Sequence, residues 1–99
     1  MSNIEREELI SLYDIYESLL TEKQRLYFED YYYSDLSLAE IAENYEVSRN
    51  AVFDQLKKVE ELLISYEEKL SLKKKYNSIL ELVKDESLKK KIIDIFWEE

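Results

Sequence analysis

The side chains with the most definite chemistry gather in one short segment near the middle of the chain. Ser48 can accept a hydrogen bond as the N-cap of a helix, and Arg49 and Asn50 follow at once. Guanidinium and amide groups donate to phosphate oxygens and base edges, and a helix amino terminus adds free N–H groups and a dipole that favour anions. We therefore predict a nucleic-acid-binding surface made of Ser48, Arg49, Asn50, Phe53, Lys57 and Lys58.

This surface depends on two helices that must cross in a fixed way. In a helix-turn-helix, the first helix needs a small residue at the crossing point, and the second needs apolar residues that face the first. Ala42 meets the first need, and Val47, Val52 and Leu56 meet the second. The pattern predicts a helix-turn-helix whose binding surface points away from the core.

Three residues argue against strong DNA recognition by this motif. Asp54 and Phe53 stand where a DNA-reading helix would gain from basic or amide side chains. Glu46 occupies a turn position that commonly holds Gly, at a cost of about 1 kcal/mol if that position is left-handed. The motif is therefore stronger evidence for structure than for DNA binding.

The charge of the chain is unevenly distributed. Its formal net charge is −9. Residues 1–46 hold three basic and twelve acidic side chains, which gives −9, whereas residues 47–99 hold eleven of each, which gives zero. Nucleic acid repels an acidic protein at long range, so we expect weak, strongly salt-dependent binding that favours structured RNA over duplex DNA.

The residue types that are missing exclude several classes of function. The chain has no Cys, His, Gly or Pro, which removes disulfides, thiolate nucleophiles, imidazole bases, most transition-metal sites and glycine-rich phosphate loops. We predict no enzyme activity, no catalytic residues, no cofactor and no metal. The acidic start, and the lack of an apolar run near the roughly 20 residues of a membrane span, predict a cytoplasmic protein without membrane insertion.

Apolar spacing predicts an all-α fold throughout the chain. An amphipathic helix is expected within residues 3–20. Capping-box patterns start the next two helices, Thr21 with Gln24 and Ser37 with Glu40. No segment shows the alternation of a strand.

The helix that begins after Ser48 is expected to be long and to end near Tyr76. Short helices are expected at residues 79–83 and at the end of the chain. We predict a helix-turn-helix domain at residues 1–58, followed at residues 59–99 by a long-helix extension and a helical tail that form one structural unit.

Apolar residues along the long helix alternate steps of four and three, over roughly two and a half heptads. Such a seam packs either on the core of its own chain, including carboxyl-terminal helices that fold back, or on a partner helix. If the seam packs on a partner helix, we expect that helix to belong to a second copy of the chain, in a homodimer. The predicted partner or dimer contacts are Leu56, Val59, Leu63, Tyr66 and Leu70.

Three other groups of residues each have two possible roles. The tyrosines at 31–33 could stack on unpaired bases, but core packing is favoured, with Tyr33 the most exposed. The glutamate pairs at 60–61 and 67–68 are predicted to lie on a solvated helix face, because adjacent side chains point about 100° apart. The lysines at 73–75 are expected to complement the carboxyl end of a helix rather than to bind phosphate.

Conspicuous short segments of the chain are Leu20-Thr21-x-Lys23-Gln24, Ser37-Leu38-Ala39-Glu40-Ile41-Ala42 and Val47-Ser48-Arg49-x-Ala51-Val52. With these segments the chain resembles, over about residues 12–70, the YlxM-type family of small bacterial proteins, whose helix-turn-helix is similar to the fourth region of sigma factors. The resemblance implies a non-enzymatic accessory or regulatory role in the signal recognition particle pathway, with RNA of the particle or its proteins as partners. The motif alone would also fit a DNA-binding transcription regulator, or an interaction module that has kept only the shape.

Overall fold

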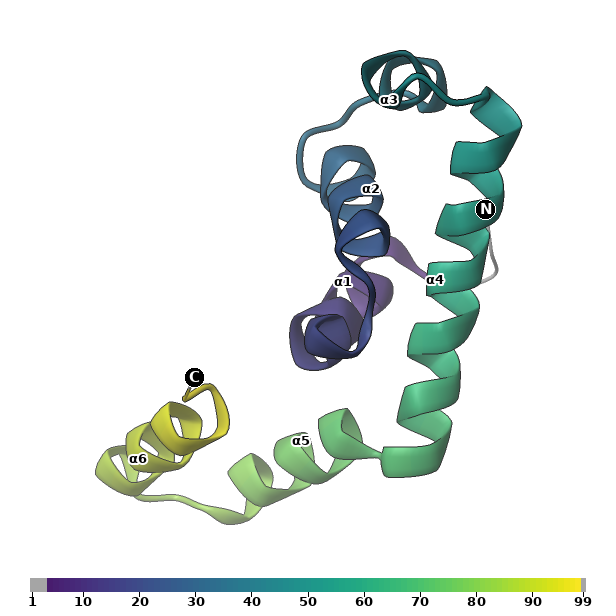
Figure 1. Cartoon of the computed structure of the whole chain (residues 1–99). Coiled ribbons are helices and arrows are strands. Elements are labelled where there is room, and N and C mark those ends of the chain that lie inside the picture. Colours follow the sequence, from purple (N-terminus) through teal and green to yellow (C-terminus); the bar gives the residue numbers. More distant parts are fainter. Residues whose placement is uncertain (1–3, 99) are drawn as a thin grey trace.

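A computed structural model describes residues 4–98, and helices make up nearly all of this range (Figure 1). In order they are α1 (Arg6–Tyr16), the 3-10 helix η1 (Glu17–Leu19), α2 (Glu22–Tyr32), α3 (Leu38–Tyr45), α4 (Arg49–Leu70), α5 (Leu72–Leu82) and α6 (Glu86–Phe96). No strand occurs between residues 4 and 98. The predicted all-α fold is confirmed.

Three helices begin where the polar side chains predicted. The Thr21 hydroxyl accepts a hydrogen bond from the N–H of Gln24 at 3.1 Å, and the Gln24 side chain accepts one from the N–H of Thr21 at 3.0 Å. Ser37 and Glu40 make the same reciprocal pair at the start of α3. Ser48 accepts from the third residue of α4 at 3.0 Å. Each cap satisfies N–H groups that the helix itself leaves free.

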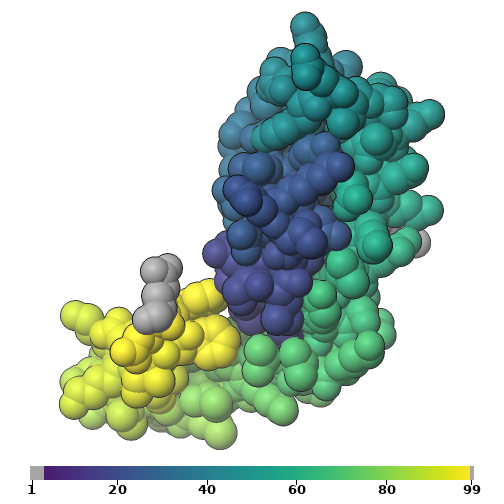
Figure 2. Space-filling view, viewed as in Figure 1, coloured from purple at the N-terminus to yellow at the C-terminus, as the bar shows by residue number. Residues whose placement is uncertain are grey.

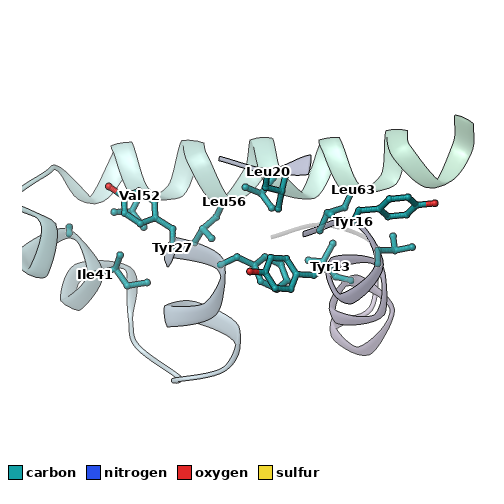
Figure 3. Packing of buried hydrophobic residues seen from close by; sticks show 13 residues of the cluster. Tyr13, Tyr16, Leu20, Tyr27, Ile41, Val52, Leu56 and Leu63 are labelled. Atoms are coloured by element: carbon teal, nitrogen blue, oxygen red, sulfur yellow. The ribbon is translucent and has the colours of Figure 1, made fainter. Parts of the chain in front are cut away.

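One hydrophobic core lies between α4 and the three helices α1 to α3 (Figure 3). The predicted seam lies in this core as far as Leu63, and Tyr66 is half-buried, whereas Leu70 is exposed. The seam residues as far as Tyr66 therefore pack within their own chain, on the core formed with α1 to α3, and Leu70 lies outside this core. The predicted boundary at residue 58 falls inside α4, and buried residues continue on both sides of it. The buried apolar residues are Leu9, Leu12, Tyr13, Tyr16, Leu20, Tyr27, Phe28, Ile41, Ala42, Val52, Leu56, Val59 and Leu63.

The predicted continuous helix over residues 48–76 is wrong, because α4 ends at Leu70. Ser71 has φ 54° and ψ 32°, which is left-handed, and α5 begins at the next residue in a new direction (Figure 1). The short helix expected at 79–83 belongs to the second half of α5. A helix break without Gly or Pro needs other contacts to hold it.

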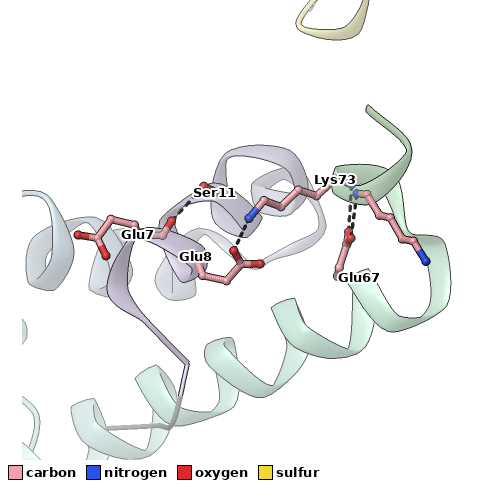
Figure 4. Close-up of polar contacts among 6 residues, drawn as sticks. Glu7, Glu8, Ser11, Glu67 and Lys73 are labelled. Atoms are coloured by element: carbon pink, nitrogen blue, oxygen red, sulfur yellow. Dashed lines mark hydrogen bonds and ion pairs between the residues drawn. The ribbon is translucent and has the colours of Figure 1, made fainter. Parts of the chain in front are cut away.

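The carboxylate of Glu67 holds this break together (Figure 4). It accepts from the N–H of Lys73 and from the N–H of Lys74, each at 3.1 Å, so a side chain of α4 caps the first turn of α5. The Tyr16 hydroxyl donates to Glu67 at 2.7 Å and accepts from the N–H of Leu72 at 3.2 Å. Burial, helped by the bond to Glu67, raises the pKa of Tyr16 to about 12, so the hydroxyl keeps its proton at neutral pH.

The structure corrects two further expectations about charged residues. Glu60 is only 4% exposed, and Glu67 is half-buried, so the predicted solvated face holds for Glu61 and Glu68 alone. The lysines at 73–75 lie in the first turn of α5, and not near a helix carboxyl end, because the chain restarts at Ser71. The errors for Glu67 and for the lysines follow from the unpredicted break between α4 and α5, whereas Glu60 is buried in the middle of α4, within the body.

The tyrosines of α2 take up the predicted packing role. Tyr31 and Tyr32 are half-buried, and Tyr33, at the end of the helix, is the exposed one. The Tyr33 hydroxyl donates to Asp14 on α1 at 2.9 Å. The predicted exposure of Tyr33 is confirmed.

The last two helices form a separate arm, which we call the tail (residues 72–98); residues 4–70 form the body. The tail extends sideways from the end of α4, and its carboxyl end comes back beside α1 (Figure 2). Among its described residues none is buried. Its main internal contact is a cluster of Tyr76, Phe96 and Trp97.

Candidate nucleic-acid interface

The link between α3 and α4 has the shape of a tight helix-turn-helix turn. Glu46 ends α3 in a left-handed conformation, with φ 56° and ψ 45°. The N–H of Val47 donates a hydrogen bond to the carbonyl of Ala42 at 3.0 Å, and the N–H of Glu46 donates one to the carbonyl of Glu43 at 3.3 Å. Backbone groups at the end of α3 are therefore satisfied, at a strain cost of about 1 kcal/mol for a left-handed residue that is not Gly.

Apolar packing between the two helices fixes the rotation of α4. Ile41 and Ala42 on α3 are buried, as are Val52 and Leu56 on α4. Ala42 is the small residue that the motif needs where the helices approach. Because the inward side of α4 is set in this way, the outward side is set as well.

The residues predicted to bind nucleic acid lie on that outward side. Ser48, Arg49, Asn50, Lys57 and Lys58 are exposed, and so is Phe53, at 37%. Arg49, Asn50 and Lys57 project within about 100° of one another around the helix axis, whereas Lys58 lies about 100° beyond Lys57. The Ser48 hydroxyl is already engaged as the cap of α4.

Exposed carboxylates lie on the same two helices and on the turn between them, and of these only Asp54 and Glu46 were considered for DNA recognition in the sequence. Asp54 is exposed on α4, and Glu40, Glu43 and Glu46 are exposed on α3 and the turn. Hydrogen bonds from the backbone and side chain of Ser37 lower the pKa of Glu40, so it remains ionised. Glu40 and Glu43 are three positions apart and therefore lie on one helix face, so the sequence already indicated an acidic face on this helix. The surface is therefore mixed in charge and not a continuous basic stripe.

The chemistry available to this surface is recognition. Arg49 and Lys57 can donate to phosphates, and Asn50 can form a paired contact with an adenine edge. Among residues 4–98, no three His, Cys, Asp or Glu side chains group in a way that could hold a metal ion. Within the same range, no helix has both the length and the apolar character needed to cross a bilayer.

Comparison with known proteins agrees with the architecture of α3 and α4. A family model described as "UPF0122: Putative helix-turn-helix protein, YlxM / p13 like" matches residues 4–96. A UPF0122 protein of Geobacillus kaustophilus is 54% identical over 77 residues, which cover 75% of this chain and 70% of the relative.

Two relatives from Bacillus are similar to the same degree. A UPF0122 protein of Bacillus pumilus is 55% identical over 73 residues, covering 74% of this chain and 66% of the relative. The UPF0122 protein YlxM of Bacillus subtilis is 55% identical over 71 residues, covering 72% of this chain and 64% of the relative. The match thus spans about two thirds of the length of these relatives. The chain belongs to the UPF0122 family of helix-turn-helix proteins similar to YlxM and p13.

Proposed function

We propose that this chain is a non-enzymatic accessory protein of the signal recognition particle pathway, which contacts structured RNA through Arg49, Asn50 and Lys57. The observation that carries the RNA contact is the fixed exposure of these three side chains at the start of α4. The pathway rests on the resemblance to the YlxM-type family, and family membership supports that resemblance.

Charge favours structured RNA over duplex DNA as the ligand. A helix in the major groove of DNA has phosphates on both sides. Here the exposed carboxylate of Asp54 lies on the same helix as Arg49 and Lys57 and would enter the groove with them, and the exposed Glu40 and Glu43 add negative charge on the adjacent helix. RNA loops offer a few phosphates and unstacked bases at one place, so they need only the short basic segment and the exposed ring of Phe53.

A salt titration tests this proposal. Binding of wild type and of the Arg49→Ala and Lys57→Ala variants is measured against a structured RNA and a random DNA duplex at several salt concentrations. Each variant should weaken RNA binding and lower the salt slope by roughly 0.7 to 0.9 units, because one phosphate contact is lost. Lys69→Ala, at the far end of α4, is the matched control and should keep the wild-type slope.

Asn50→Ala separates base reading from phosphate contact. If Asn50 reads a base, the variant loses about 1–3 kcal/mol on a preferred target only. Tight, sequence-specific binding to duplex DNA would instead support a transcription regulator and contradict the RNA proposal.

A second candidate is a protein-interaction module, which the mixed surface of Phe53, Asp54 and the α3 carboxylates favours. A pull-down from native cytoplasm, with and without ribonuclease, distinguishes the two. The second candidate is supported if signal recognition particle proteins are still captured after ribonuclease treatment and the purified chain binds no RNA at low salt.

A further inference from the structure

A second surface lies at the opposite end of α4, where the tail returns beside the body (Figure 2). A hollow of about 530 Å³ separates α1 and η1 from the carboxyl end of α6. A smaller hollow of about 140 Å³ adjoins it and shares Asp14, Ile15 and Trp97. We call the two hollows together the acidic groove. The side chains that matter below are Asp14, Ile15, Glu17, Phe96, Trp97 and Glu98.

One wall of the acidic groove is aromatic and held in place. Trp97 is 43% exposed, so its ring is accessible. Its indole N–H donates to the hydroxyl of Tyr76 at 3.1 Å, and its ring packs edge-on against Phe96 at 5.0 Å between centroids. Phe96 in turn stacks on Tyr76 at 4.2 Å. Trp97 therefore presents an oriented aromatic surface.

The other wall is acidic and has no cation of its own. Asp14 and Glu17 on this wall, and Glu98 next to Trp97 on the facing wall, are exposed, and within residues 4–98 none of the three forms an ion pair. One oxygen of Asp14 accepts from Tyr33 at 2.9 Å, which orients the carboxylate and leaves its second oxygen available. The nearest lysine of the groove, Lys73, is taken up by an ion pair with Glu8.

Polar contacts join the body to α5 (Figure 4), and the cluster of Tyr76, Phe96 and Trp97 joins α5 to α6, so the two walls are connected through α5. The ion pair of Glu8 and Lys73 joins α1 to α5. The Tyr16 hydroxyl links α1 to both Glu67 and the N–H of Leu72. The groove is thus formed before any ligand arrives, which lowers the entropic cost of binding.

We propose that the acidic groove binds a basic peptide segment of a partner protein, with one arginine side chain stacked on Trp97 and its charge directed at Asp14 and Glu17. A guanidinium is planar, stacks on aromatic faces and pairs with carboxylates, so it matches both walls at once. The net charge of −9 in residues 1–46 attracts such a segment at long range. This surface is separate from the start of α4, so it does not depend on RNA binding.

The single tryptophan of the chain allows a direct test. A short synthetic peptide that alternates Arg with Leu is titrated into the full chain while Trp97 fluorescence is recorded. A saturable change is expected, with affinity that falls as salt rises. A peptide with Gln in place of every Arg should produce no saturable change.

Variants locate the contact. In anisotropy measurements with labelled peptide, the double variant Asp14→Asn, Glu17→Gln should bind roughly tenfold more weakly, because two charge contacts are lost. Trp97→Leu should weaken binding by a similar factor. The matched control is the double variant Glu22→Gln, Glu43→Gln, which removes the same charge from exposed sites on α2 and α3 and should keep at least half of the wild-type affinity.

Three results would overturn the proposal. If the groove variants and the control variant weaken peptide binding equally, the peptide is attracted by the general negative charge and not by the groove. Self-association of the chain that disappears in the Asp14→Asn, Glu17→Gln variant would make a second copy the occupant. Absence of peptide binding at low salt, with thermal melting of all variants unchanged, would show that the groove has no such ligand. Arg49→Ala should leave peptide binding intact, so failure here is distinct from failure of the RNA proposal.

Discussion

The helices of the tail are at least as amphipathic as most helices of the body, yet among the described residues only the body has a buried core. The thirteen apolar residues that are buried within residues 4–98 all fall in the segment from Leu9 to Leu63. The tail is also rich in apolar residues, but Leu82 remains 82% exposed and no described tail residue is buried. The difference is coverage: three helices pack on one side of α4, whereas α5 and α6 have mainly each other and the edge of α1.

This contrast shows what apolar spacing can and cannot specify. Regular spacing creates an apolar face on each helix, but burial needs a third element to close over that face. The tail is therefore held by a few directed contacts, chiefly Glu67 with the start of α5 and the cluster around Trp97. Its stability should depend on polar groups and charge, and that of the body on packing.

The largest expected effect compares one leucine from each region. Leu63→Ala should lower the free energy of unfolding by about 2–5 kcal/mol, because the leucine is fully buried and its removal leaves a cavity. Leu82→Ala, the matched change on the exposed tail, should stay within about 0.5 kcal/mol of wild type. Urea unfolding followed by circular dichroism measures both.

Similar losses in the two variants would contradict the distinction between body and tail. They would mean that Leu82 is covered in solution, and a mass measurement would then show whether another copy covers it. Mass measurement also tests the homodimer that the sequence left as an alternative. Because Leu63 is buried within the chain, Leu63→Asp places a charge in the core and should unfold the monomer, whereas at a dimer contact it would only dissociate the dimer.

An intermediate effect is expected at the junction of the two regions. Glu67→Gln should destabilise the docking of α5 by about 1–2 kcal/mol, because the hydrogen bonds to Lys73 and Lys74 lose their charge. Glu68→Gln, the exposed neighbour, is the control and should change little. Trp97 fluorescence reports the tail, and the circular dichroism signal reports the whole chain.

The pH dependence of this effect has a definite sign. Burial raises the pKa of Glu67, but the bonds from Tyr16 and from the N–H groups of Lys73 and Lys74 outweigh burial, and the net pKa is lowered. The stabilisation is therefore complete above the unfolded pKa of about 4.3 and is lost as pH falls through the lower, folded value. Docking of the wild-type tail should weaken in acid, and docking of the tail in the Glu67→Gln variant should not show this loss with falling pH. A tail signal in Glu67→Gln that falls with pH as in wild type would assign the dependence to another carboxylate.

The sequence predicted the body well because its signals are local. The caps at Thr21, Ser37 and Ser48 act on residues three positions away, so a short window contains both partners. The turn at Glu46 and the buried face of α4 follow from the same short-range spacing. The exposure of Arg49 and Asn50 could be predicted for this reason.

The junction and the groove could not be predicted, because they depend on residues that are far apart in the chain. Tyr16 and Glu67, which fix the break at Ser71, are separated by 51 positions. Asp14 and Trp97 meet only because the tail turns back. The exposed carboxylates of α3 were visible in the sequence, but their place relative to α4 depends on how the two helices cross.

The smallest expected effect concerns the strained turn of the body. Glu46→Gly should raise the free energy of unfolding by about 0.5 kcal/mol, because the relief of left-handed strain exceeds the added entropy of the unfolded chain. Glu43→Gly, three residues earlier inside α3, should instead cost about 1 kcal/mol. Both are measured by urea unfolding at neutral pH. A loss of stability in Glu46→Gly would show that the Glu46 side chain makes a stabilising contact that offsets its strain, and the acidic edge of the α4 surface would then have a structural role.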